Sequence, residues 1–122
     1  MPKVDRFEEL GCWIAARKLT SVIYELKGEI KRDYGLQDQL RRAAVSVMNN
    51  IAEGFGRFSF KEKVRYLEIA QSSANEVRSM LYVLEDLSYA SPEELLRLRT
   101  LLEECQKQTW GLIRYLRSKI PK

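Results

Sequence analysis

Polar side chains that could do chemistry form a stripe in the first half of the chain. Residues three or four positions apart lie side by side on a helix, and this spacing links Arg42, Ser46, Asn50 and Glu53, with Arg57 just beyond. These residue types can form charge-assisted hydrogen bonds along a helix face. The stripe is either a polar network that fixes helix register or subunit orientation, or part of a ligand or phosphate pocket.

A second polar pair, Ser73 and Glu76, lies one helical turn apart among apolar neighbours. A carboxylate in such surroundings needs a cationic partner, and we expect Arg42 or Arg57 to pair with Glu76. Glu53 and Glu76 together could act as a paired acid and base. Nothing else in the sequence suggests a substrate pocket, so we predict no catalytic residue and do not expect an enzyme.

The composition excludes most catalytic and metal chemistry. The chain has 122 residues and no histidine, which removes histidine bases, Ser-His-Asp triads and imidazole ligands. No cofactor and no metal site is predicted. Cys12 and Cys105 are expected to be reduced, partly buried thiols. In an antiparallel bundle Cys105 would lie about a dozen residues inside the last helix, an axial offset too large for a disulfide with Cys12.

The net charge of +4 is unevenly distributed. Residues 39–66 carry six basic and two acidic groups, whereas residues 67–109 carry four and eight. The first basic cluster consists of Arg41, Arg42, Arg57, Lys61, Lys63 and Arg65, and the second of Arg114, Arg117, Lys119 and Lys122. Aromatic residues are interleaved with the first cluster, an arrangement that suits phosphate contacts and stacking on nucleic-acid bases. The alternative is a solvated charged surface over core aromatics.

Start and stop signals divide the chain into four helices. Helices are predicted over residues 6–33, 37–55, 59–88 and 92–119. The start signals are Asp5 with Glu8, Asp38, Ser59 with Glu62, and Ser91-Pro92-Glu93-Glu94. Tyr34-Gly35 and Gly54-Phe55-Gly56 provide the stops. Short connections make successive helices antiparallel neighbours, so we predict one all-α domain over residues 1–122, an up-down-up-down four-helix bundle.

The second helix is more apolar than a lone bundle requires. Its main apolar face is extended by Val45, Met48 and Ala52, so that about half of its circumference is apolar. A second apolar face favours a homo-oligomer, although these residues could instead lie at the bundle edge. No apolar run is long enough to cross a membrane, and the charged start does not resemble a signal peptide. We therefore expect a cytoplasmic protein without a membrane partner.

Two motifs carry a family resemblance. The runs Gln39–Ser46 and Asn50–Arg57 resemble the signature of the bacterial four-helix-bundle family encoded in intervening sequences of 23S ribosomal RNA genes. The resemblance implies a homopentamer without enzymatic activity and an association with ribosomal RNA or other nucleic acid. The family's polar positions correspond to Arg41, Arg42, Ser46, Asn50, Glu53, Arg57 and Glu76. Val47-Met48-Asn49 departs from the family pattern, which usually has a proline here.

The leading hypothesis is a non-enzymatic, homo-oligomeric bundle that binds RNA or DNA through its Arg-rich second helix and the turn after it. The main alternative is an assembly or scaffold subunit whose polar stripe serves contacts between subunits only.

Overall fold

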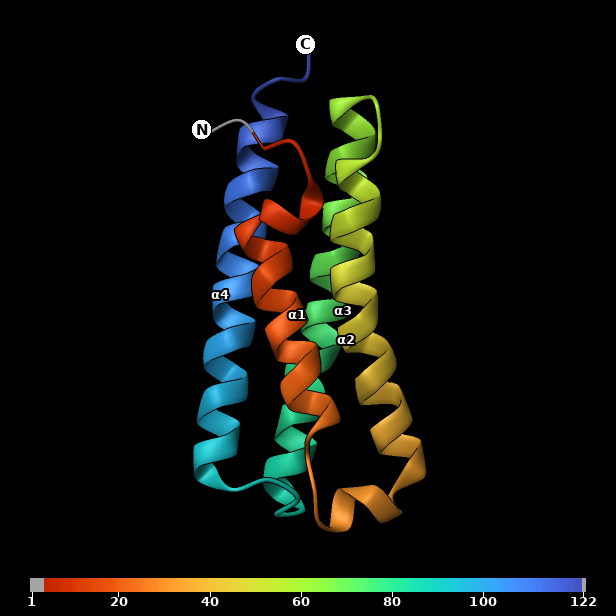
Figure 1. Ribbon diagram of the computed structural model, residues 1–122, viewed down its shortest axis with the longest axis vertical. Helices are drawn as coiled ribbons and strands as arrows, with labels where there is room; N and C mark the ends of the chain where they lie inside the picture. Colours follow the sequence, from red (N-terminus) through yellow and green to blue (C-terminus); the bar gives the residue numbers. More distant parts are fainter. Residues whose placement is uncertain (1–3, 122) are drawn as a thin grey trace.

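The protein is a bundle of four antiparallel α-helices, seen in a computed structural model that describes residues 4–121. The helices are α1 (Gly11–Tyr24), α2 (Tyr34–Phe55), α3 (Phe60–Asp86) and α4 (Pro92–Arg117). The short 3-10 helices η1 (Phe7–Glu9) and η2 (Glu29–Arg32) lie on either side of α1. Each helix packs against the next and α4 packs against α1, which closes the bundle (Figure 1). The predicted up-down-up-down bundle is confirmed.

The core is built from one apolar face of each helix. Leu19 of α1, Leu40 and Ile51 of α2, Leu81 of α3 and Leu98 of α4 are fully shielded from solvent. Their neighbours in the same helices follow at three- and four-residue spacing, which places them on the same inward face. Burial of these faces is the main stabilising contribution to the bundle.

The predicted caps of the last two helices are confirmed. The Ser91 hydroxyl accepts a hydrogen bond from the Glu94 amide at 3.1 Å, and the Glu94 carboxylate accepts one from the Ser91 amide at 2.8 Å. Ser59 likewise accepts a bond from the amide of Glu62 at 3.1 Å. Each cap satisfies amides that have no partner within their own helix, which fixes where α3 and α4 begin.

The prediction of one long first helix over residues 6–33 was wrong. The chain forms η1, then α1, and leaves the helix after Tyr24; Gly28 adopts a positive φ of 90°. Leu26 and Ile30 are nevertheless buried, with 3% and 1% of their surface exposed. Leu26 lies between α1 and η2 and Ile30 lies in η2, and together they close the end of the bundle. Their apolar spacing therefore resembles that of a continuing helix. Asp5 does not cap this helix, whose first residue is Gly11.

The second helix begins earlier than predicted. Asp33 caps α2 by accepting a hydrogen bond from the amide of Leu36 at 3.2 Å, so the helix starts at Tyr34 and not near Asp38. Gly35 lies inside its first turn and does not end the preceding helix. The helix then continues without a break to Phe55.

The expected separation of the two cysteines was wrong. Cys12 and Cys105 are both free and buried, as expected. However, the Cys105 thiol donates a hydrogen bond to the backbone oxygen of Cys12 at 3.4 Å, so the two residues lie at the same level. The reason is that α4 extends well beyond the start of α1 (Figure 1). Burial raises the pKa of both thiols, that of Cys105 to about 12.

Candidate nucleic-acid interface

The polar stripe on α2 continues onto α3. The hydroxyl oxygens of Ser46 and Ser73 lie 2.7 Å apart. The Asn50 amide donates to both the backbone oxygen and the hydroxyl of Ser46, at 2.9 and 3.1 Å. Ser73 is buried, and the other two residues are half-buried. This network sets the register of α2 against α3, because a shift of either helix would leave polar groups unpaired.

The two carboxylates of the predicted polar set lie far from each other. The level of Ser46 and Ser73 separates them, since Glu53 lies toward the end of α2 and Glu76 toward the far end of α3. At 1.5 Å rise per residue their separation along the bundle is about 15 Å. The structure therefore does not bring Glu53 and Glu76 together as an acid and base pair.

The expected cationic partner of Glu76 was also wrong. Arg42 pairs with Asp38 at 2.8 Å within α2, and Arg57, in the turn after α2, pairs with Glu53 at 2.6 Å. The Glu76 side chain is exposed and makes no ion pair with any of residues 4–121. Its solvent exposure removes the need for a partner.

Two arginines of the first basic cluster are held by tyrosines. The guanidinium of Arg41 lies 4.4 Å from the ring centre of Tyr24 and donates to that residue's backbone oxygen at 3.4 Å. The guanidinium of Arg57 lies 4.6 Å from the ring centre of Tyr66 and donates to its hydroxyl at 2.7 Å. Both arginines are half-buried. Arg41 connects α2 with α1, and Arg57 connects the α2–α3 turn with α3.

The first basic cluster is divided into two groups. Arg41 and Arg42 lie in the first half of α2, about 20 Å along the helix from the turn that follows it. The other four members gather at the turn between α2 and α3 and on the first turns of α3: Arg57, Lys61, Lys63 and Arg65. Only this second group lies at the turn that follows α2.

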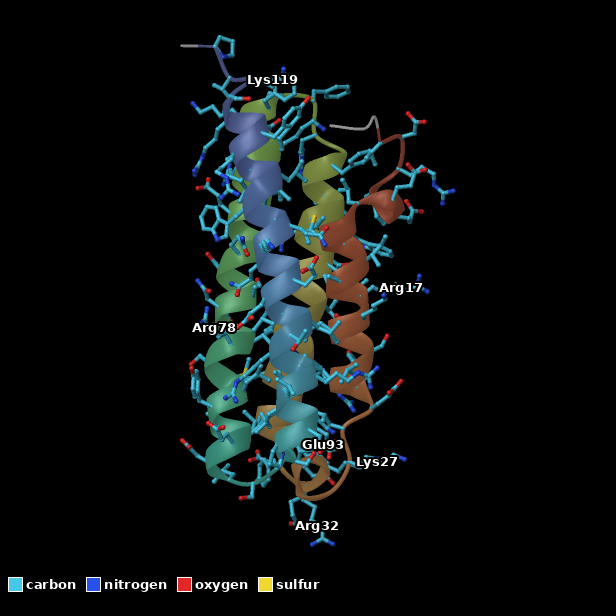
Figure 2. The ribbon with its side chains drawn as sticks, turned by 90° about the vertical axis from the view of Figure 1, so that its left-hand side faces the viewer. Arg17, Lys27, Arg32, Arg78, Glu93 and Lys119 are labelled. Atoms are coloured by element: carbon cyan, nitrogen blue, oxygen red, sulfur yellow. The ribbon has the colours of Figure 1, made fainter. Side chains whose placement is uncertain are left out.

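The second basic cluster lies at the same end of the molecule. The α2–α3 turn and the C-terminal end of α4 are adjacent at one end of the bundle (Figure 1), where Lys119 is labelled in Figure 2. Lys27, Arg32 and Glu93 mark the opposite end (Figure 2). We call the first of these the basic end, formed by Arg57, Lys61, Lys63, Arg65, Arg114, Arg117 and Lys119. Lys122 lies outside the described residues.

Exposed aromatic rings accompany the charges of the basic end. Phe58, in the turn, is fully exposed, and Phe60 and Tyr115 keep 42% and 40% of their surface in solvent. Within residues 4–121 only Arg57 and Arg117 of the basic end form ion pairs, the latter with Glu68 at 2.7 Å. The exposed cations without an ion pair are therefore available for a ligand with negative charge: Lys61, Arg65, Arg114 and Lys119.

Lys63 differs from the other cations of the basic end because it faces inward. Its ammonium donates to the backbone oxygen of Phe55 at 2.6 Å and lies 5.5 Å from the centre of the Phe55 ring. Burial lowers the pKa of Lys63. Sequence reasoning placed Lys63 with the surface cations because the apolar surroundings come from several helices.

No group of three or more acidic or cysteine ligands close enough to hold a metal ion occurs among residues 4–121. In the same part of the chain, every helix is too short or too polar to span a membrane.

The fold and the surface charges together define a small helical bundle with one basic end and a polar seam between α2 and α3, formed by Ser46, Asn50 and Ser73. The family model for 23S rRNA-intervening sequence proteins matches residues 8–111. The chain belongs to this family, and the resemblance seen in its central motifs is confirmed. The family description names no catalytic activity. No curated protein matches the sequence.

Proposed function

We propose that this chain is a non-enzymatic subunit of a homo-oligomer, a pentamer as the family resemblance implies, that binds RNA or DNA through its basic end. The observation that carries the proposal is the joining of two basic segments, distant in sequence, around exposed aromatic rings. Residues 57–66 carry four basic and one acidic side chain, and residues 110–121 carry three and none.

This combination suits a single strand or a loop better than a regular duplex. Unstacked bases can stack on Phe58 and Phe60, while Lys61 and Arg65 contact phosphates. Of the cations on α2, Arg42 is exposed but already paired with Asp38, and Arg41 is held over Tyr24. The contribution of α2 is therefore centred on the turn at its end. In a ring, repetition of the basic end would strengthen weak contacts by avidity.

Paired substitutions at opposite ends of the bundle test this role. Lys61→Ala with Arg65→Ala removes two exposed charges from the basic end, and Lys27→Ala with Arg32→Ala removes the same charge from the other end. Fluorescence anisotropy with a labelled single-stranded RNA measures the binding affinity of both double variants. For the first pair we expect weaker binding and a salt-dependence slope reduced by about 1.4, because each lost phosphate contact contributes about 0.7 for single strands. Equal effects of the two pairs would contradict binding at the basic end.

A separate, apolar surface supports the proposed self-assembly. Apolar side chains at helical spacing follow one side of α3 and continue to its C-cap, and we call them the apolar stripe: Ile69, Met80, Val83 and Leu87. Ile69, Val83 and Leu87 expose 39%, 38% and 51% of their surface. Of the apolar α2 residues expected at an interface, Val45, Met48 and Ala52 are half-buried within the single chain. An exposed stripe of this kind is typical of a surface that a partner covers.

The stripe also supports the alternative, an assembly subunit that binds another protein. Val83→Glu places a charge on the stripe, and Leu96→Glu, on exposed α4 surface, is the matched control. We expect light scattering after size exclusion to show an oligomer for the wild type and the control and smaller species for Val83→Glu, with circular dichroism unchanged. A wild type that stays monomeric at all concentrations would refute self-assembly and favour the alternative.

A further inference from the structure

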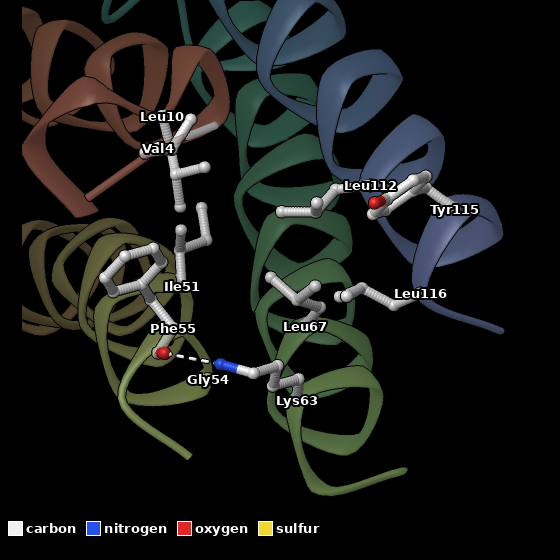
Figure 3. A pocket seen from close by; sticks show the side chains of 10 residues that line it. All are labelled: Val4, Leu10, Ile51, Gly54, Phe55, Lys63, Leu67, Leu112, Tyr115 and Leu116. Atoms are coloured by element: carbon white, nitrogen blue, oxygen red, sulfur yellow. Dashed lines mark hydrogen bonds between the residues drawn. The ribbon is translucent and has the colours of Figure 1, made fainter. Parts of the chain in front are cut away.

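An apolar cavity lies at the basic end of the bundle (Figure 3). Its volume is about 330 Å³, at the lower end of the range for small-molecule sites. Side chains from α2, α3, α4 and the segment before α1 line it, among them Leu10, Ile51, Phe55, Leu67, Leu112 and Leu116. Such a space has room for one short alkyl chain.

The cavity exists because the helices differ in length. α2 and α4 both extend beyond the start of α1, and at this level the place of α1 in the bundle is taken by Val4 and Leu10 (Figure 3). Leu67 and Leu116 close the side formed by α3 and α4. The apolar walls therefore follow from the packing of the helices.

One cation faces this apolar space. The Lys63 ammonium makes its hydrogen bond to the Phe55 backbone oxygen at 2.6 Å, as Figure 3 shows. No carboxylate of residues 4–121 forms an ion pair with Lys63. An ammonium has three N–H donors, so Lys63 retains capacity for an anionic acceptor. Burial disfavours its charged form, and a bound anion would offset that effect.

From this combination we infer that the cavity binds an amphipathic monocarboxylate, with its alkyl chain among the leucines and its carboxylate on Lys63. Tyr115 also lines the cavity. Two-chain lipids exceed the volume. Binding is independent of nucleic-acid binding, because the carboxylate site uses the inward-facing lysine and not the exposed cations.

Isothermal titration with decanoate, below its micelle concentration, tests the inference. We expect a dissociation constant on the order of 10–100 µM, as for a ligand of this size with one charged contact. 1-Decanol should bind at least about tenfold more weakly, because it keeps the chain and loses the charged hydrogen bond. Decylamine should not bind, since its ammonium would meet that of Lys63. Absence of decanoate binding, or equal binding of all three compounds, would overturn the inference.

Two substitutions locate the site. Lys63→Met should weaken decanoate binding at least about tenfold and leave 1-decanol binding nearly unchanged, whereas Lys27→Met, with the same charge change at the opposite end, should alter neither. Leu116→Trp fills the cavity and should abolish binding of both compounds while the circular dichroism spectrum stays helical. Unchanged decanoate binding in Lys63→Met would show that the carboxylate is held elsewhere and would overturn the assignment.

Discussion

Gly54 lies at a close approach of α2 to α3, and its replacement by alanine tests that approach. A Cβ atom at this position would lie 3.1 Å from the Cβ of Tyr66 and 3.2 Å from the backbone oxygen of Lys63. Both atoms belong to, or lie next to, the backbone of α3, so neither can move without shifting the helix. Alanine therefore forces the two helices apart at the point where the basic end begins.

The magnitude follows from two opposing contributions. Glycine to alanine in a helix interior stabilises by about 0.5–1 kcal/mol when space is available. Overpacking at a tight contact destabilises by about 1–3 kcal/mol. For Gly54→Ala we expect a net loss of about 1 kcal/mol in the free energy of unfolding. Gly111→Ala in α4, where nothing lies within 4 Å of the added Cβ, should gain about 0.5–1 kcal/mol.

Urea denaturation followed by circular dichroism, at one protein concentration, measures the free energy of unfolding of both variants. The expected difference between them is about 2 kcal/mol, with Gly54→Ala the less stable. If Gly54→Ala is stabilised as much as Gly111→Ala, the close α2–α3 contact does not exist in solution and the reasoning is refuted.

Three further predictions concern the polar seam, a cap and the buried thiols. A double-mutant cycle on Ser46→Ala and Ser73→Ala should give a coupling of about 0.5–1.5 kcal/mol in urea denaturation, and additive effects would contradict their 2.7 Å contact. Ser91→Ala should destabilise the protein by about 1 kcal/mol by thermal or urea unfolding, because the hydroxyl that accepts the hydrogen bond from the Glu94 amide is lost; no change would contradict the cap. The raised pKa of Cys105, about 12 against about 8.5 in an unfolded chain, favours the folded state below pH ~8.5, and this contribution is lost as the pH rises toward 12. Unfolding measured across that window should therefore be less pH-dependent in Cys105→Ala, and an identical pH profile would contradict burial of the thiol.

Features encoded by a few neighbouring residues could be predicted from the sequence. The caps at Ser59 and Ser91 depend on side chains three residues away, and both are present. The first helix was predicted too long because Leu26 and Ile30 keep a helical spacing although the chain turns at Gly28. The two residues keep a helical spacing because both are buried. The spacing of apolar residues does not show whether the chain between them is helical.

Features that depend on helix register could not be predicted. The offset between α1 and α4 places Cys12 beside Cys105, and neither helix encodes that offset locally. The ring of Tyr66 beneath Arg57 and the cavity beside Lys63 likewise require the relative positions of several helices. The sequence placed the two basic clusters correctly along the chain, but only the fold brings their members to one end.

Binding of nucleic acid is the central claim, and a fluorescence-anisotropy titration of the wild-type protein tests it most directly. The panel is a structured ribosomal RNA fragment, a single-stranded DNA and a duplex DNA, each at two salt concentrations. We predict binding that weakens steeply with salt and favours the RNA or the single strand over the duplex. No binding to any of the three at low salt would contradict the claim.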